Sequence, residues 1–243
     1  MDDALVAPRP GGRTFSAEVI AGLGDTGPGG RVRFDALARW LQDVAYRDVG
    51  DAGLLDDGTW IVRRLRLRVE RFPRFDERCT LTTFCSGVGQ VVAERRTTVR
   101  GDAGAHVEAV ALWVHLESGG EGLRAPSDAY RAVYGTSAGD RRVRARLFHD
   151  PAPPEGAAER PFTFRAADLD LADHVNNAAY WTALEELLGR DEVPEPCDVE
   201  LEHRAPSDAG AVRLAGDASR AWVLDPGGAP LATLLARPVG TGE

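Results

Sequence analysis

The segment richest in chemical groups runs from Asp168 to Tyr180 of the 243-residue chain and reads Asp-Leu-Asp-Leu-Ala-Asp-His-Val-Asn-Asn-Ala-Ala-Tyr. Asp170 supplies a carboxylate and His174 an imidazole, a few residues before a stretch with helical spacing. Asn176 or Asn177 can cap that helix, and its free backbone N–H groups favour a developing negative charge. These are the groups that acyl transfer needs. An Asp- and Asn-rich turn is also a common cap without chemistry, so spacing alone leaves both interpretations open.

The elements that would position this turn follow from hydrophobic periodicity. In the second half the pattern predicts a strand over 162–167 and a helix over about 178–188, and then four strands over 197–204, 211–217, 220–225 and 231–238. In the first half it predicts a strand within 15–23 and an amphipathic helix over 33–49 with a cap at Gly50, and then strands over 60–70, 78–86, 90–100 and 106–117. Short turns between the strands favour antiparallel pairing.

The first of these long strands shows how a face is assigned from the sequence. Ile61 shares one parity with Leu65, Leu67 and Val69, and a run of arginines occupies the other parity. We therefore expect a half-buried strand with an arginine-rich outer face.

Both halves thus repeat one order of elements, and a shift of 143 residues places Asp25 on Asp168. This indicates an α+β fold in which a curved antiparallel sheet wraps a long helix twice, the tandem or double hotdog architecture. The expected organisation is a leader over 1–14, an N-terminal hotdog over 15–118, a linker over 119–160 that is partly helical near 127–134, and a C-terminal hotdog over 161–243.

Composition excludes several classes of protein. The formal net charge of −9 argues against nucleic-acid binding. Three cysteines without a CxxC pair favour a reducing compartment, and the lack of a signal segment or of a long apolar run argues against secretion and a membrane span. We expect a cytoplasmic protein. The five histidines show no metal-ligand spacing, so no metal is expected, and His203 is expected to be a partly buried spacer in a strand.

Two short motifs match known sites without the required context. A GxGxxG pattern spans 22–27, but the strands after it are antiparallel, whereas a dinucleotide site needs a parallel βαβ unit. A GxSxG pattern spans 135–139, but the arginine-rich stretch after it is too polar for the packed helix of a hydrolase elbow.

The turn at 168–180 resembles the signature of acyl-acyl-carrier-protein thioesterases, here Asp-Leu-Asp-x-x-x-His-Val-Asn-Asn-x-x-Tyr. Weaker matches occur in consistent order at 52–55, 59–64, 69–73, 107–114 and 199–204, so the resemblance covers about 15–239. It implies a double-hotdog enzyme that hydrolyses the thioester between a fatty acyl chain and its carrier protein, with no metal or organic cofactor.

The resemblance also implies roles for individual residues. Asp170 matches the catalytic Asp, which would activate water or attack the thioester, and His174 matches the catalytic His, which would orient the carboxylate or assist proton transfer. Backbone N–H groups near Asn177 and Ala178 would hold the thioester oxygen. The chain departs from the family at three further positions, where Ala172 replaces an Asn and Pro206-Ser207 replaces a Glu-Cys pair.

Several candidate replacements and accessory residues follow. Ser207 is retained as a candidate auxiliary group, and a shifted register offers Glu202 or Asp208 in place of the missing Glu. The acyl pocket is expected to be lined by Trp40, Leu41, Trp60 and Val62, and docking of the acidic carrier is expected at Arg141, Arg142 and Arg144. At the 143-residue shift, Gly27 falls on Asp170 and Arg31 on His174, which predicts one site per chain.

Two alternatives remain open from the sequence. The chemistry is shared with a coenzyme A thioesterase of the same fold, and the changes at Ala172 and Pro206 also fit a non-catalytic acyl-binding hotdog. Because a tandem chain pairs its two sheets internally, either a monomer or a homodimer is compatible with the sequence.

Overall fold

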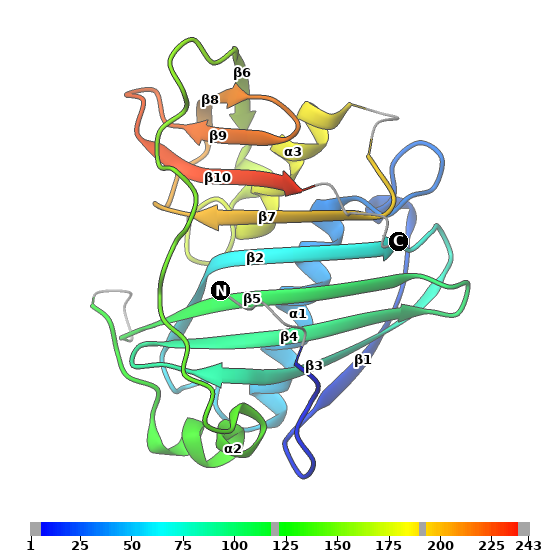
Figure 1. Ribbon diagram of the computed structural model, residues 1–243, viewed down its shortest axis with the longest axis vertical. Helices are drawn as coiled ribbons and strands as arrows, with labels where there is room; N and C mark the ends of the chain where they lie inside the picture. Colours follow the sequence, from blue (N-terminus) through cyan, green and yellow to red (C-terminus); the bar gives the residue numbers. More distant parts are fainter. Residues whose placement is uncertain (1–5, 118–121, 190–192, 238–243) are drawn as a thin grey trace.

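A single ten-stranded sheet forms the frame of the molecule, in the order β1-β3-β4-β5-β2-β7-β10-β9-β8-β6, with all neighbours antiparallel (Figure 1). The computed structural model describes residues 6–117, 122–189 and 193–237. The N-terminal half contributes β1 (Phe15–Ile20), β2 (Thr59–Arg71), β3 (Arg78–Val88), β4 (Val92–Gly101) and β5 (His106–Leu116). The C-terminal half contributes β6 (Glu159–Phe164), β7 (Cys197–His203), β8 (Gly210–Gly216), β9 (Arg220–Leu224) and β10 (Pro230–Arg237).

The helices lie behind this sheet in Figure 1, where α1 (Phe34–Asp51) crosses the N-terminal half and α3 (Tyr180–Leu188) the C-terminal half. Short 3-10 turns, η1 (Leu23–Asp25), η2 (Ala166–Asp168) and η3 (Asn177–Ala179), lead toward them. The amphipathic pattern places the apolar side of each helix against the sheet, and the rings of Phe34 and Trp181 meet at 5.8 Å between the helices. None of the helices in the described residues is long and apolar enough to cross a bilayer.

The predicted double-hotdog architecture is confirmed, with small shifts at the ends of elements. The helix expected to stop before Gly50 continues through Asp51 to a cap at Ala52, and Gly53 then takes the left-handed conformation at φ +70°. Glycine is favoured where φ is positive just after a helix, and this position, Gly53, lies three residues after the predicted cap at Gly50. Residues 1–5 of the predicted leader, the boundary at 118–119, and 238–243 at the chain end lie outside the described residues.

The two halves join edge to edge through β2 and β7, where Leu65 pairs with Leu201. β2 contains a bulge between Val62 and Arg64, which reverses the side-chain alternation at its start. Val62 is therefore buried, whereas Ile61, which was expected on the buried face, is partly exposed. The parity of the strand could not show this reversal, because a bulge adds a residue without a hydrophobic signature.

The segment between the halves contains α2 (Asp128–Ala138), which packs on β3 beyond the C-terminal end of α1. The GxSxG pattern lies in this helix and just after it, and the Ser137 hydroxyl donates to the carbonyl of Tyr134, so no hydrolase elbow forms. The chain then crosses in front of the sheet (Figure 1). It covers part of the face expected to be the outer one, since the Arg64 guanidinium is buried over the ring of Phe148 at 4.9 Å, whereas Arg68 on the same face is exposed.

Candidate active site at the second helix entrance

The turn that precedes α3 is built by backbone hydrogen bonds that also occur in the first half. The N–H of Asp170 donates to the carbonyl of His174 at 2.9 Å, and the N–H of Gly27 donates to the carbonyl of Arg31 at 2.9 Å. Three more backbone bonds of the second turn have a counterpart 143 residues earlier in the first. In the second turn they run from Asp168 N to Arg165 O, from Asn176 N to Asp168 O and from Asp173 N to Asp170 O. In the first turn the counterparts run, in the same order, from Asp25 N to Gly22 O, from Arg33 N to Asp25 O and from Gly30 N to Gly27 O. The chain thus contains two copies of one turn, and the first has Gly27 and Arg31 where the second has the carboxylate of Asp170 and the imidazole of His174.

Asn176 is the residue that organises the second turn. Its side-chain Nδ2 donates to Asp170 Oδ2 at 3.2 Å, while its Oδ1 accepts from the N–H of Ala178 at 2.9 Å and from Gln42 Nε2 at 3.2 Å. Asp170 Oδ1 also accepts from the N–H of Ala172 at 2.9 Å. One amide therefore caps the helix, orients the carboxylate and connects both to α1. Gln42 gave no signal in the sequence, because a polar residue beside a helix stripe is ordinarily solvated.

His174 lies at the surface of this turn, with about half of its side chain exposed, and its Nδ1 is 3.6 Å from Asp208 Oδ1. Among the described residues, its imidazole makes no hydrogen bond to the Asp170 carboxylate. Asn176, and not His174, hydrogen-bonds the Asp170 carboxylate, and Asp208 is the one of the two candidate replacement carboxylates that lies near the imidazole; its role stays a prediction.

The two candidate auxiliary residues lie in different places. Glu202 is fully buried on the opposite face of the sheet, where it accepts from the backbone N–H groups of Phe148 and His149. Ser207 is next to the turn, but its hydroxyl donates to the carbonyl of Asp208 and its own carbonyl accepts from Val175 at 2.8 Å. Neither side chain is directed at Asp170 by a hydrogen bond.

Of the two N–H groups named at the helix entrance, one is hydrogen-bonded within the protein and the other is available to a ligand. Asn176 already accepts from the N–H of Ala178, so that group is not free for a ligand. No described residue accepts from the N–H of Asn177, which leaves it as the available backbone donor of the pair named from the sequence.

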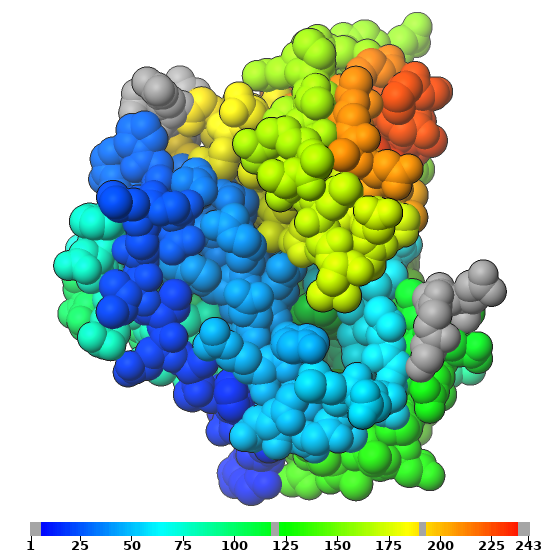
Figure 2. Space-filling model, turned by 180° about the vertical axis from the view of Figure 1, so that it is seen from behind, coloured from blue at the N-terminus to red at the C-terminus, as the bar shows by residue number. Residues whose placement is uncertain are grey.

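A cavity extends from this entrance between α1, α3 and the sheet. Figure 2 shows the molecule from behind, and the opening is the hollow beside the turn over 168–176. Asn177, Leu41 and Val62 line it, whereas Trp40 is buried in the surrounding core. Trp60 lies outside the cavity in a second cluster, stacked on His115 at 4.3 Å. The rest of the lining is mostly apolar, with a few polar groups: Ala38, Gln42, Leu65, Arg95, Thr97, Ala109, Ala111, Trp113, Ala178, Trp181 and His203.

The arginines proposed for carrier docking lie just after α2. Arg141 is committed to an ion pair with Glu94 and to the carbonyl of Ser86, while Arg142 and Arg144 are exposed. This segment enters the crossing in front of the sheet, whereas the turn at Asp170 faces the rear (Figures 1 and 2). Docking at Arg142 and Arg144 stays a prediction.

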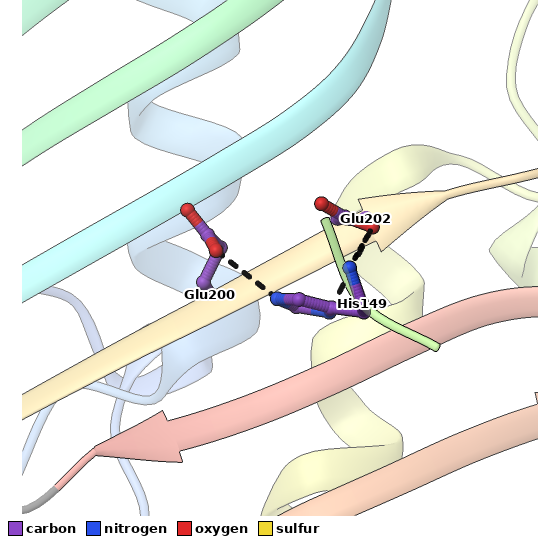
Figure 3. Close-up of side chains that lie close together, drawn as sticks. All are labelled: His149, Glu200 and Glu202. Atoms are coloured by element: carbon purple, nitrogen blue, oxygen red, sulfur yellow. Dashed lines mark hydrogen bonds and ion pairs between the residues drawn. The ribbon is translucent and has the colours of Figure 1, made fainter. Parts of the chain in front are cut away.

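One cluster with metal-ligating residue types lies in the described residues, on the face of the sheet opposite the turn. His149 of the crossing segment lies between Glu200 and Glu202 of β7 (Figure 3). The carboxylates already meet cations and N–H donors: Arg64, Arg237 and His149 on Glu200, and Arg204 with two backbone N–H groups on Glu202. The three guanidinium groups outnumber the two carboxylates, so an added cation would be repelled. The cluster instead holds the linker against β7.

Comparisons with known proteins identify the family of the chain. Residues 12–134 match the profile described as the acyl-ACP thioesterase N-terminal domain, and residues 152–213 match the acyl-ACP thioesterase C-terminal domain. An uncharacterised protein of Mycobacterium tuberculosis is 26% identical over 74% of this chain and 72% of its own length. Oleoyl-acyl carrier protein thioesterase 2 of Arabidopsis thaliana is 22% identical over 70% of this chain, which spans about half (52%) of that protein.

The fold is also shared with a solved structure. The crystal structure of an acyl-ACP thioesterase from Bacteroides thetaiotaomicron superimposes with a TM-score of 0.73 at 16% identity, covering 92% of this chain and 98% of the other. The fold is a double hotdog, and of the two copies of the turn only the second carries Asp170 and His174. Because family profiles match both halves, the chain belongs to the acyl-ACP thioesterase family of thioester hydrolases.

Proposed function

We propose that the chain hydrolyses fatty acyl-acyl carrier protein thioesters at the turn around Asp170, and releases a free fatty acid and the carrier protein. The observation that carries this proposal is the arrangement of Asn176, which holds the Asp170 carboxylate beside the N-terminus of the η3–α3 helix. The cavity that begins at Asn177 has mostly apolar walls, and since its free volume is about 20 Å³ in this structure, it has to widen to take an acyl chain.

In the proposed reaction, the Asp170 carboxylate takes a proton from water while the water oxygen bonds to the thioester carbonyl carbon. The negative charge that forms on the carbonyl oxygen is stabilised by the N–H of Asn177 and the positive end of the helix. Collapse of this intermediate breaks the carbon–sulfur bond, and the leaving thiolate accepts a proton. His174, half exposed at the mouth and next to Asp208, supplies that proton and is replenished from solvent.

The experiment measures free fatty acid released from a panel of acyl-carrier substrates by mass spectrometry. Asp170→Asn is expected to lower turnover by at least about 100-fold, the scale of a lost general base, and His174→Ala by about 10-fold or more. Asp173→Asn is the matched control, because Asp173 is an exposed carboxylate of the same turn and Asn tolerates its φ of +61°.

The outcomes separate the remaining functions. Near-normal turnover in both Asp170→Asn and His174→Ala contradicts the site. Tight acyl binding without release by the unaltered protein identifies a non-catalytic acyl-binding hotdog, which the changes at Ala172 and Pro206 would then explain. Equal turnover of acyl-coenzyme A and acyl-carrier substrates points to the coenzyme A thioesterase.

The setting of the enzyme is part of the proposal. We place it in the cytoplasm, a location supported by three buried free thiols, with burial the main cause that raises the pKa of Cys79 and of Cys197 to about 12. The reaction as proposed uses no metal or organic cofactor. Since the sheet is already continuous between the halves, a monomer suffices for the site, and a homodimer would leave it unchanged.

A further inference from the structure

His203 lies at the end of β7 and is part of the cavity that begins at the catalytic turn. Alternation along the strand directs Glu202 toward the linker and His203 toward the helices, where its ring meets the ring of Tyr180 edge-on at 5.1 Å. Only 5% of the residue is exposed, and it lines the same cavity as Asn177 and Ala178.

The imidazole of His203 has an unmet hydrogen-bonding atom. Its Nε2 is buried and has no hydrogen-bond partner among the described residues. A buried polar atom without a hydrogen-bond partner costs about 1–3 kcal/mol of stability. The simplest explanation for a histidine at this position is that a ligand supplies the missing partner of Nε2. The cavity that His203 lines is the space in which such a ligand would bind.

The surroundings keep this imidazole neutral. Burial is the main cause that lowers the pKa of His203 to about 3, and the nearby guanidinium of Arg63 lowers it further. Arg63 is the extra residue of the β2 bulge, and it donates to the carbonyl of Arg204 at 3.0 Å. A neutral imidazole keeps one N–H group, whereas taking up a proton would place a second buried cation near Arg63. His203 is therefore suited to donate a hydrogen bond and unsuited to act as a general base.

We propose that His203 is a catalytic residue of this site, whose Nε2–H donates a hydrogen bond to the carbonyl oxygen of the bound acyl thioester. This inference rests on the proposed function. His203 and the N–H of Asn177 then form the two donors that hold the oxygen as it becomes negative. Ala172 and Pro206 replace the polar residues that the family has at these positions. The proposed hydrogen bond from His203 comes instead from β7, across the cavity from the turn.

The test compares His203→Phe with His203→Gln. Phe preserves most of the volume and the contact with Tyr180 but has no N–H, whereas Gln retains an N–H donor. We expect His203→Phe to lower kcat for acyl-carrier hydrolysis by about 100- to 1000-fold with little change in KM, as for loss of one oxyanion donor. His203→Gln is expected to retain kcat within about 10-fold. A packing role predicts the reverse order, with Phe active and Gln impaired.

A second measurement uses the unaltered protein and does not depend on how a variant folds. In protein labelled with ¹⁵N-histidine, a ketone analogue with a methylene in place of the thioester sulfur should shift the His203 Nε2–H resonance downfield. No shift at saturation, or full turnover of His203→Phe, overturns the inference. If Asp170→Asn is inactive while His203→Phe is active, only the role of His203 fails. If Asp170→Asn is active, the proposed catalytic turn itself fails.

Discussion

At the scale of single residues, Asp48 holds together the buried charges at the far end of the cavity. It is completely buried in α1, and its carboxylate accepts from Arg13 Nε at 2.7 Å, from an Arg95 nitrogen at 2.5 Å and from the Tyr134 hydroxyl at 3.0 Å. Arg95 in turn lines the cavity beside the Asp170 turn. The carboxylate therefore positions part of the cavity wall as well as compensating a buried cation.

Replacing Asp48 should destabilise the fold strongly. We expect Asp48→Ala to lower the free energy of unfolding by about 3–5 kcal/mol, because it leaves the Arg95 guanidinium buried without its carboxylate. Urea denaturation at pH 7 measures this change. Asp51→Ala is the control, since Asp51 also pairs with Arg13 but is 59% exposed at its side chain, and it should cost less than about 1 kcal/mol. Equal losses in the two variants would contradict the assignment.

At the scale of elements, the crossing segment after α2 is fastened to β7 through buried charge. Burial acts to raise the pKa of the Glu200 carboxyl, but His149, Arg64 and Arg237 together lower it to about 2. Because this pKa lies below the ordinary value of 4.5 for a Glu carboxyl, ionised Glu200 stabilises the folded state above about pH 4.5. The contribution is lost as the pH falls toward 2.

This fastening predicts a defined acid sensitivity. Between pH 5 and pH 2 the unaltered protein should lose about 3 kcal/mol more stability than Glu200→Gln, from the difference in the two pKa values. Unfolding curves across that range provide the measurement. Glu159→Gln, which removes an exposed partner of Arg213, should keep the slope of the unaltered protein. Parallel pH profiles for Glu200→Gln and the unaltered protein would show that Glu200 is not the titrating group.

At the scale of the whole molecule, a clamp between the helices joins the halves behind the shared sheet. The guanidinium of Arg31 binds both carboxylate oxygens of Glu185, at 3.1 and 2.5 Å, and Glu185 also accepts from the backbone N–H of Phe34 at 2.8 Å. Arg31 occupies the position in the first turn that His174 occupies in the second. The duplicated turn therefore serves assembly in one half and, as we propose, catalysis in the other.

Loss of the clamp should weaken both halves together. We expect Glu185→Ala to lower the free energy of unfolding by about 2–3 kcal/mol, because the substitution leaves the Phe34 N–H without an acceptor and removes the ion-pair partner of Arg31. Since the sheet is continuous, unfolding followed by circular dichroism and by tryptophan fluorescence should coincide. Glu186→Ala, at the exposed neighbouring position, should change stability by less than about 0.5 kcal/mol. Two separate transitions in the unaltered protein would contradict this coupling.

The limits of prediction are visible at particular residues. Leu41 lies on the cavity wall as expected, because helical spacing assigns a face directly. Ile61 was expected on the buried face and is exposed, because a bulge reverses the alternation of the strand at that point. Glu202 was a candidate for the site but lies on the other side of the sheet, since register and the path of the linker determine which side a charged face meets. His203 was expected to be a spacer, because nothing local shows that its neighbours leave an atom unpaired.

By itself, the sequence determined the order of the elements, the repeated turn and the pairing of Asp170 with His174, which the first copy lacks. Those features depend on periodicity and spacing within about a dozen residues, where chain geometry alone places side chains on a face. Only the tertiary structure decided that Gln42 reaches Asn176, that His203 borders the same cavity, and that the linker covers Arg64 with the ring of Phe148. Such contacts join distant parts of the chain, and strand register, the bulge and the packing of two halves establish them.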